Sequence, residues 1–194
     1  DGGLNAPMGL AMDGEGRLYV ADSFNHRIQV FDLEERFLCK SGTRGEGNGE
    51  FRQPMGIAVD GEGRVYVTDE NNNDRIMVFD PDGRFLREWG DYGEEGLNPS
   101  GIAVDGEGNV YVTDSDNHRI QAFGGSTPSV VSQQDDEPLQ SNPPKIPVAR
   151  ETAWELLNEW GGYGDGDAEF DCPTGIAIDS AGRIYVSDSE NHRI

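Results

Sequence analysis

Short apolar runs alternate with turn-forming residues along most of this chain. In residues 99–123, an apolar run at 101–104 leads into a glycine-containing turn, and a second run follows at 110–113. A polar stretch separates this second run from a third one that starts at Arg119. The runs are rich in β-branched and aromatic residues, which favour strands, and the glycines can adopt the positive φ of a tight hairpin. The pattern therefore predicts a β-meander.

The same arrangement occurs four times. Every copy opens with the motif Pro-x-Gly-apolar-Ala-apolar-Asp and continues with an apolar-Tyr-Val run. The opening prolines are Pro7, Pro54, Pro99 and Pro173. The first three follow one another at intervals of about 46 residues, a period typical of propeller blades or of another repeat array. The longer last interval indicates one period plus an insertion.

These repeats divide the chain into blades. The boundaries fall at about residues 7–42, 54–90 and 99–161, with a partial fourth blade at 173–194. The insertion occupies residues 124–153, in the turn between the third and fourth strands of the third blade. Its proline, serine and polar residues bury too little apolar area to offset the entropy of ordering them, so we expect a flexible excursion.

The expected fold is all-β: a β-propeller of four-stranded antiparallel blades. A closed propeller needs about four to eight blades, whereas the repeats amount to three whole blades and half of another. We therefore expect an open arc of about three and a half blades. The remaining blades would come from the rest of a longer chain or from elsewhere.

A short motif follows the second strand of three copies. It reads Asn25-His26-Arg27, Asn117-His118-Arg119 and Asn191-His192-Arg193, and the second copy departs from it with Asn73-Asp74-Arg75. Together with the proline-glycine and Tyr-Val motifs, it resembles the NHL-repeat family over nearly all of the chain except the insertion. The resemblance implies a propeller, commonly six-bladed, whose first strands line a central channel. It does not imply one function, because a fold hosts many sites.

An aspartate ends each second strand, and an arginine begins each third strand. Across the turn the two side chains can exchange charge-assisted hydrogen bonds, so we interpret them as structural pairs. The pairs are Asp22 with Arg27, Asp69 with Arg75, Asp114 with Arg119, and Asp188 with Arg193.

The charge balance narrows the set of partners. The chain has 15 Lys and Arg against 37 Asp and Glu, a formal net charge of −22, which disfavours binding to nucleic acid. The charge can serve solubility alone, or it can attract a cationic partner or calcium. No apolar run approaches the roughly 18 residues of a membrane span, and nothing in the sequence fixes a compartment. Cys39 and Cys172 occupy non-equivalent repeat positions, so we expect both to be unpaired.

The sequence gives little support for a zinc site. The three histidines occupy equivalent corners of separate blades, too far apart for the roughly 2 Å bonds of zinc. A similar propeller enzyme, the amidating lyase, implies zinc-binding histidines just after the opening prolines. The matching residues are Met8, Met55, Ser100 and Thr174.

Calcium has two weak candidates. The aspartates Asp13, Asp60, Asp105 and Asp179 are adequately explained as turn formers. The acidic run at 165–171 lacks the spacing of an EF-hand. We predict no cofactor and keep calcium as an alternative.

Binding of a partner molecule is the remaining function to consider. The connectors between blades and the turns after the second strands emerge on one face, while Phe51, which ends one connector, is expected to point inward between blades. The residues best suited to a partner surface are Arg44, Tyr92, Glu94, Tyr163 and Asp165. We predict a non-catalytic module that binds a protein or another extended polymer. The alternative is a propeller lyase or hydrolase whose metal-dependent site is completed by other blades.

Overall fold

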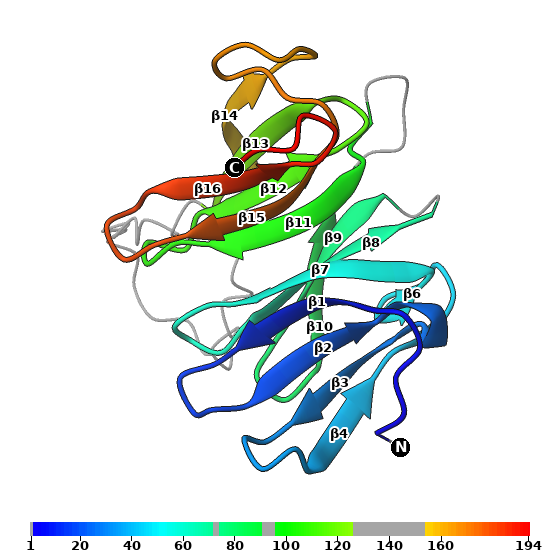
Figure 1. Ribbon diagram of the computed structural model, residues 1–194. Coiled ribbons are helices and arrows are strands. Elements are labelled where there is room, and N and C mark those ends of the chain that lie inside the picture. Colours follow the sequence, from blue (N-terminus) through cyan, green and yellow to red (C-terminus); the bar gives the residue numbers. More distant parts are fainter. Residues whose placement is uncertain (1, 72–73, 91–95, 126–153) are drawn as a thin grey trace, which may run out of the picture.

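The computed structural model describes residues 2–71, 74–90, 96–125 and 154–194 (Figure 1). Strands dominate this part of the chain, and its one helical element is the three-residue 3₁₀ turn η1 (Ser23–Asn25). Nowhere in these ranges is there a helix long and apolar enough to cross a membrane. The expected all-β fold is confirmed.

Three four-stranded antiparallel sheets are followed along the chain by a two-stranded one. The first sheet contains β1 (Pro7–Met12), β2 (Leu18–Asp22), β3 (Arg27–Phe31) and β4 (Phe37–Ser41). The second contains β7 (Gln53–Val59), β8 (Val65–Glu70), β9 (Arg75–Phe79) and β10 (Phe85–Trp89). The third contains β11 (Pro99–Val104), β12 (Val110–Asp114), β13 (Arg119–Gly125) and β14 (Trp154–Gly161). The last pairs β15 (Pro173–Ile178) with β16 (Ile184–Asp188). A short parallel pair, β5 (Thr43–Arg44) and β6 (Glu50–Phe51), closes the connector between the first two sheets.

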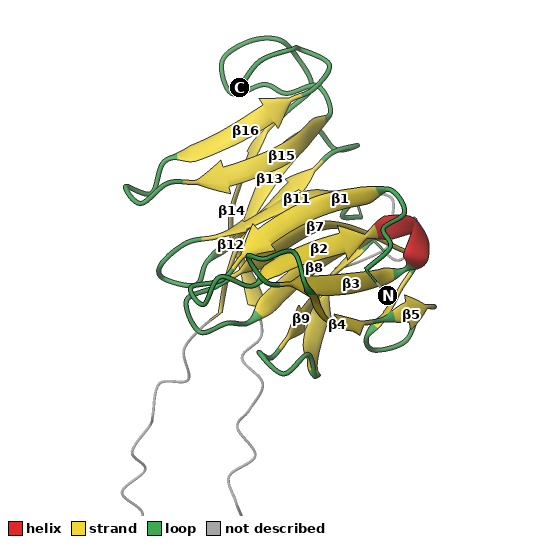
Figure 2. Ribbon diagram, turned by 60° about the horizontal axis from the view of Figure 1, so that its bottom comes forward, coloured by secondary structure: helices red, strands yellow, loops and turns green. Residues whose placement is uncertain are grey.

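The first strands of the four sheets lie side by side in the order β1, β7, β11 and β15, and the sheets fan outward from them (Figures 1 and 2). Glycine permits this close approach: a Cβ on Gly9 would lie 2.4 Å from the carbonyl oxygen of Met55. The same 2.4 Å approach recurs between Gly56 and Ser100 and between Gly101 and Thr174. The repeated Pro-x-Gly motif therefore sets the distance between neighbouring first strands.

The core consists of clusters that each join two neighbouring sheets. The first cluster places Tyr19 and Val30 of the first sheet against Val65 and Val67 of the second. The intervening residue, Tyr66, points the other way, into a second cluster shared with the third sheet. The first three residues of β8, 65–67, are continuously apolar because sheets cover both faces of this strand.

Phe51 lies in the first cluster. Its side chain is 0% exposed, and its ring centroid is 5.8 Å from that of Phe79. The expectation that Phe51 points inward between adjacent blades is therefore confirmed. The connector can turn over this ring because Gly42 has φ +99° and no side chain; a Cβ there would lie 2.5 Å from the ring.

The third sheet runs further than the sequence indicates. Strand β13 continues through Gly125, two residues into the predicted insertion, because Gly124 and Gly125 pair with Glu155 and Trp154. The rest of the predicted insertion, residues 126–153, lies outside the described residues.

Candidate functional site

Each sheet has two ends that differ in chemistry. The turns between first and second strands, and those between third and fourth strands, form what we call the turn end. The turns between second and third strands, together with the connectors between sheets, form the loop end. Comparing them shows where side chains are left available for a ligand.

At the turn end, each aspartate is occupied by its own turn. One carboxylate oxygen of Asp60 accepts the backbone N–H groups of Glu62 and Arg64, both at 2.9 Å. The other accepts Nε of Arg64 at 2.6 Å and the hydroxyl of Tyr66 at 3.0 Å. Burial acts to raise the pKa of Asp60, but these hydrogen bonds outweigh it and hold the pKa below its ordinary value.

The other three copies repeat this arrangement. Equivalent hydrogen bonds surround Asp13, Asp105 and Asp179. Within the described ranges, no group of three or more His, Cys, Asp or Glu side chains is placed to hold a metal ion. The turn aspartates are therefore already engaged by groups of their own hairpins.

At the loop end, the Asp–Arg ion pairs form in all four copies, and three of them are hydrogen-bonded. The Nε–Oδ2 distance is 2.7 Å for Asp22 with Arg27, 2.7 Å for Asp114 with Arg119, and 2.8 Å for Asp188 with Arg193. In the second copy the corresponding distance, from Arg75 to Asp69, is 3.8 Å. The sequence has one extra residue in this turn, at 71–74.

These aspartates also hold the connectors, a role that the sequence reasoning missed. Asp114 accepts the backbone N–H of Asn98 at 2.8 Å, and Asp188 accepts that of Asp171 at 2.7 Å. The pKa of Asp188 is lowered because hydrogen bonds from Asn191, Asp171 and Arg193 outweigh the opposing effect of burial. Each buried carboxylate thus ties a connector to the second strand of the blade that follows it.

Two arginines of the Asp–Arg pairs also donate hydrogen bonds to the backbone of the connectors. Arg75 donates to the carbonyl oxygens of Glu46, Gly47 and Glu50, at 2.8, 3.1 and 2.9 Å. Arg193 binds the equivalent carbonyls of the last connector, those of Asp165, Gly166 and Glu169. Two connectors, residues 42–53 and 161–172, therefore share one backbone shape around a guanidinium group.

The histidines link neighbouring sheets as well. Nδ1 of His26 donates to the carbonyl of Arg52 at 2.5 Å, and Nδ1 of His118 accepts the N–H of Cys172 at 3.2 Å. Both histidines have positive φ, 56° and 52°, at the end of their turns. Their hydrogen bonds are to the backbone of the following connector.

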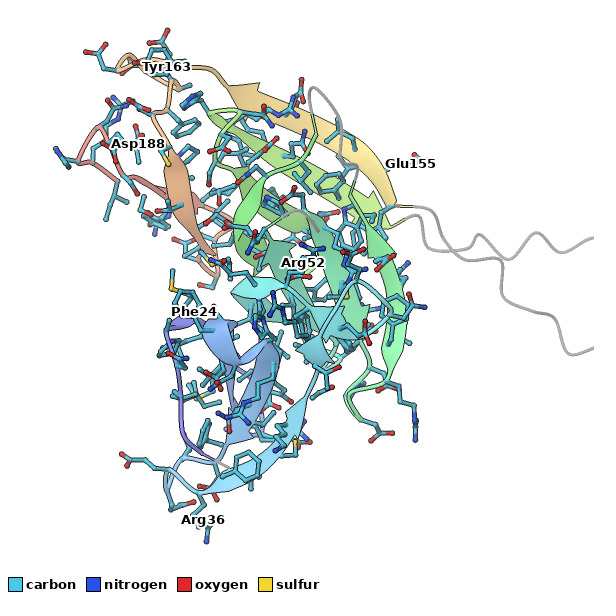
Figure 3. The ribbon with its side chains drawn as sticks, turned by 90° about the vertical axis from the view of Figure 1, so that its right-hand side faces the viewer. Phe24, Arg36, Arg52, Glu155, Tyr163 and Asp188 are labelled. Atoms are coloured by element: carbon cyan, nitrogen blue, oxygen red, sulfur yellow. The ribbon has the colours of Figure 1, made fainter. Side chains whose placement is uncertain are left out.

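The matched connectors present different side chains to solvent. Arg44 follows Gly42 by two residues, and Tyr163 follows Gly161 by two; both side chains are exposed. Tyr163 is 72% exposed, and one edge of its ring system meets the imidazole of His118 at a centroid distance of 4.9 Å (Figure 3). Asp165 is exposed beside it. Tyr92 and Glu94 lie outside the described residues, so the structure does not place them.

Two further features of the loop end were missed. Phe24 is 59% exposed in η1, at the position where other copies carry Asp116 and Glu190 (Figure 3). Aligning the four turns residue by residue would have revealed it. Arg52 forms an ion pair with Glu46 beside the first connector.

A cluster of acidic side chains surrounds Cys172 at the loop end. Burial raises the pKa of the Cys172 thiol, and the charges of Asp116, Glu190, Asp171 and Glu70 raise it further. We call these four carboxylates the acidic rim. Burial raises the pKa of Glu70 to about 7, and repulsion from Asp74 and Asp116 adds to the effect.

A groove runs along the first strands. It measures about 320 Å³ and is lined at successive strands by Met8, Met55, Ser100 and Thr174 with their neighbouring glycines. The residues that follow the opening prolines therefore face it, and they contribute thioether and hydroxyl groups but no imidazole.

Antiparallel sheets whose first strands meet side by side, joined by the same turn and connector devices, define a propeller-like repeat protein. The chain belongs to the NHL repeat family, whose repeat is matched at residues 4–31, 51–79, 97–123 and 170–194. The resemblance inferred from the sequence is thus confirmed.

Relatives share short parts of their length with this chain. The chain is 28% identical over 91 residues to protein brain tumor of Drosophila melanogaster, an alignment that covers 46% of this chain and 9% of that protein. It is 37% identical over 91 residues to the B-box type zinc finger protein ncl-1 of Caenorhabditis elegans, covering 46% of this chain and 11% of the relative. The match thus spans about a tenth of either relative.

Solved structures share the fold. A virginiamycin B lyase from Staphylococcus aureus aligns with a TM-score of 0.60 at 15% identity, over 95% of this chain and 50% of the lyase. A putative gluconolactonase aligns with a TM-score of 0.61 at 13% identity, over 94% of this chain and 57% of that one. At these identities the likeness concerns the fold alone.

Proposed function

We propose that this chain is a non-catalytic binding module that recognises a protein, or another extended polymer, through its loop end. The observation that carries the proposal is the matched pair of connectors. Arg75 and Arg193 hold the same backbone shape in both, while the exposed tips differ, Arg44 in one and Tyr163 in the other. Rigid scaffolds with variable tips are typical of recognition surfaces.

Charge supports a partner with a basic segment. The acidic rim lies at the loop end, and the chain as a whole carries a net charge of −22. Complementary charge steers association and suppresses like-charged partners such as nucleic acid. The exposed ring of Tyr163 can add a contact with a Lys or Arg side chain of the partner.

A peptide selection tests the proposal. Random peptides displayed on phage are selected against the full chain, and the enriched peptides are measured by fluorescence anisotropy. We expect Lys- and Arg-rich peptides whose affinity falls with salt and drops about tenfold on Tyr163→Ala, whereas Arg44→Ala should weaken binding little or not at all, because its positive charge repels basic peptides. Arg36→Ala is the matched control, because Arg36 is exposed at the turn end. Peptides that bind Tyr163→Ala as well as the original chain would refute this surface.

A second candidate function is favoured by Glu70. Its side chain hydrogen-bonds to Ser100, which lines the groove along the first strands, and burial raises its pKa to about 7. Perturbed carboxyl groups in grooves are candidates for general acid–base work. The alternative is therefore a lyase or hydrolase whose metal-dependent site is completed by further blades. Stoichiometric zinc or calcium in the purified full-length protein, lost together with a measured hydrolytic activity on chelation, would favour it over the binding module.

Completion of the ring is part of the proposal. Met8, Leu10 and Met12 of β1 are exposed in the described part of the chain, on a strand whose counterparts in the second and third sheets lie between two neighbours. Large exposed apolar patches are typical of interaction surfaces. We propose that further blades cover this strand, in a ring for which six blades stays a prediction.

A further inference from the structure

Neighbouring sheets diverge from their first strands and enclose a wedge-shaped space, which we call a wedge (Figures 1 and 2). Two neighbouring wedges are filled by different side chains. Between the second and third sheets, Trp89 and Trp154 stack with ring centroids 5.0 Å apart and ring planes at 10°. Phe123 adds an edge contact to Trp89 at 5.8 Å. Both tryptophans pack against the second core cluster, so aromatic rings fill the outer part of this wedge.

The wedge between the first and second sheets lacks both of these rings. Trp89 stands opposite Ile76 in the sheet register, and the residue opposite the equivalent Ile28 is Ser41. Trp154 lies six residues before the Trp-Gly pair that ends its blade, and the residue six before Trp89-Gly90 is Gly83. A serine and a glycine therefore replace two tryptophans.

A cavity remains where the rings would lie. It measures about 180 Å³, and both Ser41 and Gly83 line it. Most of its remaining wall is apolar and belongs to the first core cluster, including Tyr19, Phe51 and Phe79, while Lys40 and Asp82 also line it. An enclosed apolar cavity of about 150 Å³ can bind benzene, and this partly open one is of comparable size.

We propose that this cavity is a binding site for a small, uncharged, planar aromatic molecule of the indole class. The ligand would occupy the space that the Trp89–Trp154 pair fills in the next wedge. Its stabilisation comes from removing a flat apolar surface from water and from edge contacts with the rings of Phe51 and Phe79. The site is separate from the loop-end surface, so neither proposal depends on the other.

Indole itself is the probe. Titration of indole into the isotopically labelled full chain, followed by nuclear magnetic resonance, should shift signals of Phe51, Phe79 and Ile28 in a saturable manner. Signals around Trp89 and Phe123 serve as the internal control, because that wedge is already filled. This titration uses the unaltered protein. The proposal is overturned if indole shifts only signals outside the wedge between the first and second sheets, or if it shifts no signal in a saturable manner.

A filling variant sharpens the test. Ser41→Trp places an indole where the next blade carries one, so we expect loss of indole binding and a melting temperature higher by about 2–6 °C. Leu38→Trp is the matched control: it adds the same side chain to β4 at an exposed position outside the cavity, and it should leave indole binding unchanged. A folded Ser41→Trp variant that still binds indole with the original affinity would refute the site, as would equal losses in both variants.

Discussion

The loop end and the turn end use the same residue type, aspartate, in different ways. At the turn end, Asp60 binds groups within its own hairpin, from Glu62 to Tyr66. At the loop end, Asp114 binds its local arginine and also Asn98, which lies 16 residues earlier in a connector. The first arrangement shapes one turn, while the second joins one blade to the chain segment that leads into it. The difference teaches that the loop end is where the repeats are assembled and where their surfaces can vary.

The largest effect should come from removing the side chain that anchors a connector in the core. Phe51→Ala is expected to lower the free energy of unfolding by about 3–5 kcal/mol, because the side chain is fully buried between two sheets. Urea denaturation followed by circular dichroism measures it. Phe24→Ala, at an exposed ring of the same end, should change stability by less than about 0.5 kcal/mol. Similar losses in the two variants would mean that the connector is not anchored by burial.

Asp114→Ala tests the assembling aspartate. Its side chain is 0% exposed and accepts hydrogen bonds from Asn98, Asn117 and Arg119. Removing it leaves partly buried donors without their acceptor, so we expect a loss of about 3 kcal/mol in the same assay. Hydrogen exchange should also speed up in the connector at Asn98. Exchange that stays as slow as in the original protein would contradict the tie between blade and connector.

Glu70 makes stability depend on pH in a direction opposite to the aspartates whose pKa is lowered. Its folded pKa of about 7 exceeds the ordinary value of 4.5, so the unfolded state ionises first. Stability is therefore lost as pH rises from about 4.5 through 7, whereas an aspartate with a lowered pKa, such as Asp22, loses stability as pH falls below 3.8. Glu70→Gln should raise stability at pH 8 by about 1–2 kcal/mol, allowing for solvent screening, and leave it unchanged near pH 4. Denaturation curves at both pH values decide this, and an equal change at both would contradict it.

The smallest effect is expected at the turn end of the last sheet. Asp179→Ala removes an ion pair with Arg183 whose arginine side chain is 72% exposed. It also removes the carboxylate that accepts the N–H groups of its own turn, but all of these contacts are solvent-exposed, so the change in the urea assay should be smaller than that of Phe51→Ala, Asp114→Ala or Glu70→Gln. A loss as large as that of Asp114→Ala would abolish the distinction between the two ends.

Sequence reasoning reached the repeats, the all-β class and the inward position of Phe51. It paired Asp22 with Arg27, and the structure shows a 2.7 Å contact between them. It did not foresee that Arg75 would form only a longer ion pair with Asp69, at 3.8 Å, while donating to the carbonyls of a connector. The extra residue at positions 71–74 was visible, yet its effect depends on where the connector lies. The partner residues Tyr92 and Glu94 fall outside the described residues and remain predictions.

The sequence alone determined what repeats locally: where strands begin and end, which aspartates shape hairpins, and that each first strand carries a glycine. These features depend on neighbours a few residues away, so a repeating pattern is enough to specify them. Only the tertiary structure decided that Gly9 meets Met55, that Arg193 holds the connector at Asp165, and that Ser41 and Gly83 leave a cavity where Trp89 and Trp154 fill its counterpart. Each of these contacts joins residues from different parts of the chain, and their distances follow from how the sheets pack rather than from spacing along the sequence.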